Sequence, residues 1–224
     1  MNQRDFNAAS GILGITALGI FLVWFPFVIL NVPMPTGLIA STAVNTFWEI
    51  LTGVALPYLW AVRRLGMSFG DLGLTHRKLG MSTLLGCGVY AIALAAFLHC
   101  SGGEMMANHT IRKVSLGETF LLVPMMGIIA AGTDMATRGF ILLGLARHSH
   151  VVFAIAMQNL VWFLAHIHEI GLLTDCLGVT MAVGLTLTLG ILGDVVVLRT
   201  RNVMGLAAAH FLLNVVLSVY LRYL

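Results

Sequence analysis

Long apolar segments separated by short polar ones make up most of the chain. Seven of them can cross a hydrocarbon core of about 30 Å, which takes roughly 20 helical residues. Because lipid offers no partner for backbone N–H and C=O groups, and the alternation typical of barrel strands is missing, these segments predict helices. They lie at 11–30, 38–62, 79–98, 119–146, 150–168, 176–198 and 204–222. The pattern predicts an all-α integral membrane protein, a polytopic bundle of about seven (six to eight) transmembrane helices.

The composition agrees with a membrane protein and excludes a soluble domain. Hydrophobic residues make up 59% of the 224 positions and charged residues only 9%, whereas a soluble domain carries about 25% charged residues. The net charge is +3, but the basic residues lie in short segments between apolar runs and not on one face or tail. They therefore indicate topology, and we expect no nucleic-acid partner.

The basic residues between the segments predict an orientation. With a cytoplasmic N-terminus, eight of them face the cytoplasm and three face the other side, as the positive-inside rule requires. The eight are Arg4, Arg63, Arg64, Arg77, Lys78, Arg147, Arg199 and Arg201, and the three are Arg112, Lys113 and Arg222. Only Arg4 precedes the first apolar run, which lacks a clean cleavage site, so we expect a retained first span. We expect a bacterial inner (plasma) membrane.

Two cysteines, Cys100 and Cys176, fall near the outer face in this topology. Oxidation is possible on that side, so a bridge between them is one hypothesis. Two buried, inert cysteines are the other. The sequence leaves both open.

Several ionisable and polar residues lie inside the predicted spans. Asp134 and Arg138 are spaced i,i+4 with the acid first, the orientation in which a helical pair is favoured, so we expect them to neutralise each other. Unpaired charges at this depth cost several kcal/mol. His166 follows four residues after Trp162 in the next span, and the last span carries His210 and Asn214 one turn apart.

These residues together suit the activation of a water molecule. A lone intramembrane histidine is often a hydrogen-bonding contact between helices, and a lone Asp–Arg pair can simply fix register. Two histidines, an asparagine and an ion pair on three helices can instead gather around one cavity. There an imidazole or carboxylate takes a proton while an amide or second imidazole stabilises an oxyanion. Two histidines and a carboxylate also suit zinc.

The order of these motifs resembles that of the CPBP family of intramembrane proteases, which includes CAAX prenyl proteases and bacteriocin-processing enzymes. The resemblance covers residues 68–222. It rests on Asp134-x-x-x-Arg138-Gly139, Trp162-x-x-x-His166, His210-x-x-x-Asn214 and a preceding Asp71-Leu-Gly-Leu74. It divides the one membrane domain into N-terminal transmembrane helices at 1–67 and a CPBP-like core at 68–224.

The resemblance implies a role for each matching residue. His166 would act with the family's catalytic glutamate on a water, and His210 and Asn214 would hold the substrate carbonyl and stabilise its oxyanion. Arg138 would match the first-motif arginine, with Asp134 at the position of the second glutamate. The family is thought to need no obligatory metal, so we predict no metal and no cofactor.

The chain departs from the family pattern at the leading glutamate, because Thr133 occupies that position. A threonine hydroxyl does not ionise near neutrality and cannot act as the general base. Asp134 points about 100° away from its neighbour on a helix, and we expect Arg138 to engage it. Glu49, Asp194 and Glu169 are other acids, but none has a spacing that recommends it.

Three functions follow from these residues. The first is an endopeptidase that hydrolyses a peptide bond in a membrane-associated polypeptide. The second is a pseudoprotease that binds a membrane helix, a lipid or a prenyl-like chain in assembly, maturation or immunity. The third, a small transporter, would use Glu49, Asp134 and Asp194 as proton sites on a common pathway. Membrane lipid and a membrane-bound polypeptide or transmembrane helix are the expected partners.

One expectation opposes a shared site. At 1.5 Å of rise per residue, the predicted spans place His166 near the outer end of its helix and His210 nearer the cytoplasmic side, about 10–15 Å apart along the membrane normal. A tilted helix or a misplaced boundary would remove this separation.

Overall fold

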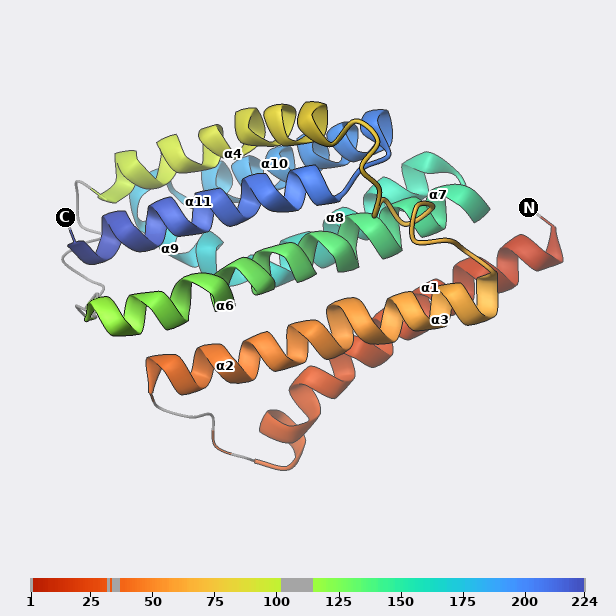
Figure 1. Cartoon of the computed structure of the whole chain (residues 1–224), viewed down its shortest axis with the longest axis horizontal. Coiled ribbons are helices and arrows are strands. Elements are labelled where there is room, and N and C mark those ends of the chain that lie inside the picture. Colours follow the sequence, from red (N-terminus) through yellow and green to blue (C-terminus); the bar gives the residue numbers. More distant parts are fainter. Residues whose placement is uncertain (1, 32, 34–36, 102–114, 224) are drawn as a thin grey trace.

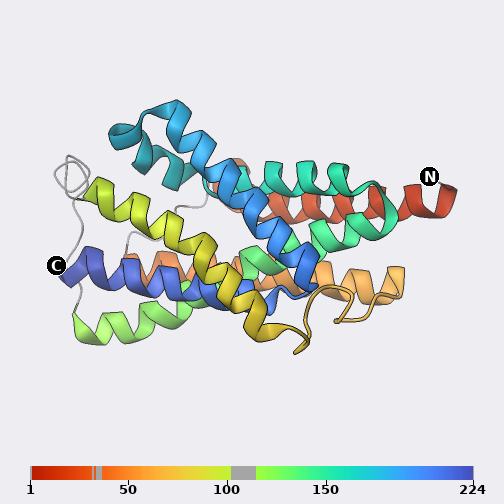
Figure 2. The ribbon, with the colours of Figure 1, turned by 90° about the horizontal axis from the view of Figure 1, so that it is seen from above.

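A computed structural model describes residues 2–31, 33, 37–101 and 115–223. The described residues form an elongated helical bundle without strands, and the two chain ends lie at opposite ends of its long axis in both views (Figures 1 and 2). The predicted all-α fold is therefore confirmed.

The helices follow the predicted apolar segments. The first segment forms α1 (Gln3–Trp24) and the π-helical η1 (Phe25–Ile29). The second forms α2 (Leu38–Trp48), the π-helical η2 (Glu49–Ala55) and α3 (Leu56–Leu65). The third segment forms α4 (Leu79–Ser101). The fourth forms α6 (Leu116–Asp134), the π-helical η3 (Met135–Leu143) and α7 (Gly144–His148). The remaining helices are α8 (Val151–Ala165), α9 (Ile167–Leu177), α10 (Val179–Thr200) and α11 (Met204–Tyr223).

Within the described residues, five helical stretches are long and apolar enough to cross a membrane, and a sixth span is possible across the bent pair α8 and α9. The last segment is helical as predicted, although its apolar part, Met204–Leu217, is shorter. These helices make the chain an integral membrane protein. The fifth segment differs from the prediction: it is broken by a 74° bend, and residues expected to connect the spans form α9.

The basic residues predicted for one side of the membrane gather at one end of the bundle. Arg63 and Arg64 lie in the last turn of α3, Arg147 in that of α7 and Arg199 in that of α10. These helix ends and the start of α1 lie toward the same end of the long axis (Figure 1). The opposing Arg112 and Lys113 lie outside the described residues, and Arg222 lies in the final turns of α11 at the other end.

The loop between α3 and α4 is tied to the turn between α10 and α11. Gly66, with φ +63°, ends α3, and Gly73, with φ +82°, lies in the following turns. The Gly73 carbonyl accepts a hydrogen bond from Val203 N at 3.0 Å. The Asn202 amide donates to the carbonyls of Thr75 and Arg77. The Asp71-Leu-Gly-Leu74 segment therefore docks the start of α4 beside the start of α11.

The helices form a layered arrangement around α6. In Figure 1, α6 lies between α2 with η2 on one side and α11 on the other, and it contacts both. The helix begins at a capping box in which Ser115 and Glu118 bond each other's backbone N–H groups. Its other end passes directly into η3, so the first predicted motif lies at a π-helical junction, a feature frequent at functional sites.

A disulfide joins Cys100 at the end of α4 to Cys176 at the end of α9. Their Cα atoms are 5.6 Å apart, within the range typical of disulfides. Of the two hypotheses for these cysteines, the structure confirms the bridge.

Candidate active site

Asp134 and Arg138 form an ion pair that is completely buried. The pair spans the junction between α6 and η3, where the acid ends one helix and the guanidinium lies one turn later. The prediction that the two charges neutralise each other is confirmed.

Arg138 also binds groups on α8 and α10. Its Nη2 donates to the Gly190 carbonyl at 3.3 Å, and its Nε lies 3.4 Å from Asp194 Oδ1. The guanidinium carbon lies 4.0 Å from the centroid of the Trp162 ring, a cation–π contact. The side chain fits because α10 has glycine where it passes: a Cβ at Gly193 would lie 2.5 Å from Nη2.

Asp194 belongs to the same buried network. Its Oδ2 accepts a hydrogen bond of 2.7 Å from the Asn159 amide, and the residue is fully buried. Asp134 and Asp194 thus share one guanidinium. Both carboxylates lie beside this one cation. Asp134, Arg138, Asn159 and Asp194 together form one buried network.

The second carboxylate oxygen of Asp134 reaches His210 on α11. His210 Nδ1 lies 3.2 Å from Asp134 Oδ2, and the Tyr90 hydroxyl donates to the same carboxylate at 3.3 Å. The Tyr90 ring stacks on the imidazole with centroids 4.6 Å apart. Because the carboxylate only accepts, Nδ1 is the donor, and Nε2 is left for other partners. Asp134 therefore orients a site histidine, which the helical-wheel argument did not anticipate.

His166 lies at the bend between α8 and α9. Its Nδ1–H donates to the Trp162 carbonyl at 2.8 Å, one turn back, and its ring lies 3.7 Å from the Trp162 ring. A side chain that bonds the i−4 carbonyl competes with the backbone ladder, which is a known cause of kinks. The backbone at His166 accordingly leaves helical geometry, with φ −109° and ψ 18°.

This bend corrects the expected depth difference between the two histidines. The His166 and His210 ring centroids are 6.1 Å apart, and not separated by about 10–15 Å as the straight spans implied. The expectation was wrong because it assumed straight, parallel spans with ends at a common level, whereas the fifth span is broken by a 74° bend after Ala165.

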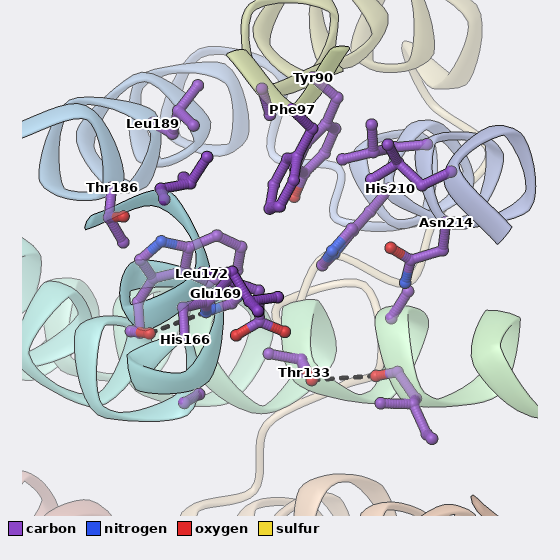
Figure 3. A pocket seen from close by; sticks show the side chains of 18 of the residues that line it. Tyr90, Phe97, Thr133, His166, Glu169, Leu172, Thr186, Leu189, His210 and Asn214 are labelled. Atoms are coloured by element: carbon purple, nitrogen blue, oxygen red, sulfur yellow. Dashed lines mark hydrogen bonds between the residues drawn. The ribbon is translucent and has the colours of Figure 1, made fainter. Parts of the chain in front are cut away.

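The histidines face a cavity of about 400 Å³. His166, His210 and Asn214 all line it, so the structure brings these three predicted site residues together (Figure 3). Asp134 and Arg138 lie behind its wall in the buried network. The rest of the lining is mainly apolar and includes Phe97, Met126, Ile129, Leu172, Leu185, Leu189, Leu213 and Leu217. The cavity therefore combines a few convergent polar groups with a hydrophobic surface, the usual composition of a ligand site.

Three further residues bear on the missing glutamate. Thr133 lines the cavity, and its hydroxyl donates to the Ile129 carbonyl at 3.0 Å. Glu49 on η2 contacts Gly132 on α6 and interacts with the Thr133 side chain, but it does not line the cavity. Glu169, on the first turn of α9, does line it.

The described residues contain no group of three or more His, Cys, Asp or Glu side chains placed to hold a metal ion. The two site histidines have other first partners: a backbone carbonyl for His166 and the Asp134 carboxylate for His210.

Sequence reasoning missed Tyr90 and Asn159 as supports of the site. Asn159 carried a signal, because an amide within an apolar span needs a partner. Tyr90 carried none, because a single tyrosine in a span is equally compatible with packing. Glycines at 190 and 193 let α10 pass close to the network, because a Cβ at Gly190 would lie 2.2 Å from Asn159 Oδ1 and one at Gly193 would lie 2.5 Å from Arg138 Nη2.

Comparison with known proteins supports the resemblance found in the motifs. Residues 115–216, which contain all three motifs and the cavity residues of α6, α8, α9, α10 and α11 except Leu217, match the family model described as type II CAAX prenyl endopeptidase Rce1-like. No significant match was found among curated proteins or among solved structures. The segment that builds this site is therefore similar to type II CAAX prenyl endopeptidases of the Rce1-like kind, a similarity consistent with a CPBP family intramembrane protease.

Proposed function

We propose that this protein is an intramembrane endopeptidase that hydrolyses a peptide bond in a membrane-associated polypeptide. The observation that carries the proposal is the convergence of His166, His210 and Asn214 from separate helices on one cavity. Each has a polar atom available for substrate or water, whereas the neighbouring buried network holds its own charges.

The proposed chemistry divides the polar groups into two sides. His210 and Asn214, one turn apart on α11, would hold the substrate carbonyl and stabilise the negative charge that develops on its oxygen. His166 would contact the attacking water through Nε2, because its Nδ1–H is committed to the Trp162 carbonyl. Asp134 is a positioning residue that holds His210 in this orientation.

The apolar walls favour a hydrophobic substrate segment. A peptide that presents an apolar stretch would bury it against the leucine and phenylalanine side chains while its scissile carbonyl meets the histidines. We propose that the substrate reaches the cavity from the membrane. We also propose a bacterial inner membrane with the N-terminus on the cytoplasmic side, and the basic residues at one end of the bundle support this orientation.

The test is cleavage of a membrane-peptide library by the purified protein. We expect products from the wild type, and we expect His166→Ala and His210→Ala each to lower kcat by roughly 10²–10⁴-fold, the contribution typical of an acid–base group. His168→Ala is the matched control, because His168 is exposed on the same stretch and does not line the cavity. Cleavage that survives both changes would remove this site from the mechanism.

A second candidate is a pseudoprotease whose cavity binds a membrane helix, a lipid or a prenyl-like chain. Thr133 favours this candidate, because its hydroxyl donates to the Ile129 carbonyl and cannot replace a carboxylate as a base. Library peptides that bind in the cavity and are never cut, even by a well-folded Thr133→Glu variant, would establish the binder and contradict the peptidase.

A further inference from the structure

The proposed peptidase needs a carboxylate that can take a proton from water, and most acids within the spans are committed elsewhere. Asp134 bonds Arg138, Tyr90 and His210, and Asp194 bonds Asn159 beside the same guanidinium. The Glu49 carboxylate lies against Gly132 and is not part of the cavity lining.

Glu169 is the only acid among the described residues that line the cavity. It lies three residues after His166, and the bend at His166 is what turns this part of the chain toward the site. Figure 3 shows its carboxylate inside the cavity, on the side where Thr133 lies. A straight fifth helix would have carried this residue beyond the level of the histidines.

The Glu169 carboxylate is also unsatisfied. Its Oε2 atom is buried and has no hydrogen-bond partner among the described residues. A buried acceptor without a partner is costly, and more so when it is charged. The first turn of α9 favours negative charge, because unpaired backbone N–H groups point toward that end of the helix. An ionised carboxylate with a free oxygen is what a water-activating base requires.

We propose that Glu169 supplies the catalytic carboxylate that Thr133 cannot supply. This assignment rests on the proposed peptidase function. The Glu169 carboxylate takes a proton from a water held with His166, and the water oxygen bonds to the substrate carbonyl carbon. The carbonyl electron pair moves to its oxygen, beside His210 and Asn214. When that pair returns, the C–N bond breaks and the leaving nitrogen takes the proton from Glu169.

Thr133 on α6 and Glu169 on α9 both line the cavity, and the Glu169 carboxylate lies on the side of the cavity where Thr133 lies (Figure 3). An acid from α9 would therefore serve the part of the cavity where the family pattern has its leading glutamate.

The test compares carboxylate variants with a membrane peptide that the wild type cleaves. We expect Glu169→Gln to lower kcat at least about 100-fold, and Glu169→Asp, which withdraws the carboxylate by one methylene, to give an intermediate value. Asp175→Asn is the matched control, because Asp175 is an exposed acid on the same helix outside the cavity, and we expect no change. Thr133→Glu in the Glu169→Gln background should restore activity, since it returns an acid to the same part of the cavity.

The outcomes separate this assignment from the function on which it rests. If the wild type cleaves no peptide, the peptidase proposal fails and this assignment fails with it. If the wild type cleaves and His166→Ala does not, but Glu169→Gln keeps full activity, the function stands and the assignment is overturned. Loss of activity in Glu49→Gln with none in Glu169→Gln would likewise overturn it and move the base to the second span. Thermal unfolding of each variant shows whether it is folded.

Discussion

Two groups of polar side chains lie next to each other inside this membrane protein, and they differ in whether they line the cavity. In the buried network, Arg138 lies between two carboxylates and Asn159 bonds the second of them. Around the cavity, His166 and His210 each use one ring nitrogen for orientation, and Glu169 has a buried oxygen without a partner. Charges that are buried against one another away from the cavity hold helices in place, whereas polar groups that line the cavity can act on a substrate.

His210 connects the two groups. Its Nδ1 bonds the network carboxylate of Asp134, and its ring faces the cavity. The network therefore does more than stabilise the fold, because it fixes the orientation of one site imidazole. This division predicts that changes in the network will act mainly on stability, and changes around the cavity mainly on cleavage.

The largest effect on stability should come from Arg138→Met. It leaves Asp134 and Asp194 buried without their counter-charge, and breaking a buried pair in this way costs about 3–5 kcal/mol. We expect a strongly lowered midpoint of thermal unfolding in detergent. Arg147→Met is the matched control, because Arg147 pairs with Asp71 at 2.7 Å at an exposed position. Equal unfolding midpoints for the two variants would show that the buried network does not stabilise the fold more than the exposed ion pair does.

A smaller loss of stability should follow from Gly193→Ala. The added Cβ would lie 2.5 Å from Arg138 Nη2 and 2.7 Å from its Cζ, so the guanidinium must shift, and overpacking of this kind costs about 1–3 kcal/mol. Gly184→Ala on the same helix is the control, since a Cβ there meets nothing within 4 Å. The comparison of unfolding midpoints would contradict the close approach of α10 to Arg138 if the two alanines behaved alike.

The smallest effect should come from Asp71→Asn, which tests an ion pair in water against the buried one. A hydrogen bond from the Ser68 backbone N–H, followed by the side chains of Ser68 and Arg147, holds the pKa of Asp71 below its usual range against the opposing effect of partial burial. A lowered pKa in the folded state stabilises the protein above the unfolded pKa, and this contribution is lost as pH falls toward the folded value. We expect a loss below about 1 kcal/mol near neutral pH, because solvent screens the pair.

The difference between wild type and Asp71→Asn should then shrink as the pH is lowered through the acid range. Unfolding midpoints measured at a series of pH values check this. A difference that grows on acidification would contradict the lowered pKa.

The sequence predicted the fold class because membrane insertion depends on summed hydrophobicity, which can be read directly from the segments. It also predicted that His166, His210 and Asn214 would meet at one cavity, because their spacing within each helix matches a known motif order. The Asp134–Arg138 pair was predictable for a similar reason: an i,i+4 spacing brings two side chains together whatever the rest of the fold does.

The site geometry was not predictable, because it depends on a bend that no residue type announces. No proline or glycine marks the break at His166. The bond from His166 to the Trp162 carbonyl accompanies the break, but a histidine within an apolar span does not by itself indicate that it will bond the carbonyl one turn back. Without the bend, α9 could not be foreseen as a wall of the cavity, and Glu169 was one of three acids with nothing to distinguish it. The stacking of Tyr90 on His210 depends likewise on how α4 and α11 meet.

The central claim is that imidazoles from two distant segments of the chain face one cavity, and a cross-linking measurement tests it without relying on activity. His166→Cys and His210→Cys are combined in a Cys87→Ser background and treated in membranes with a short bifunctional thiol reagent. We expect efficient cross-linking between positions 166 and 210, whose rings lie 6.1 Å apart. We expect none between positions 168 and 210 in a His168→Cys, His210→Cys variant, because His168 lies outside the cavity. No cross-link between positions 166 and 210, with free thiols reactive at both, would contradict the central claim.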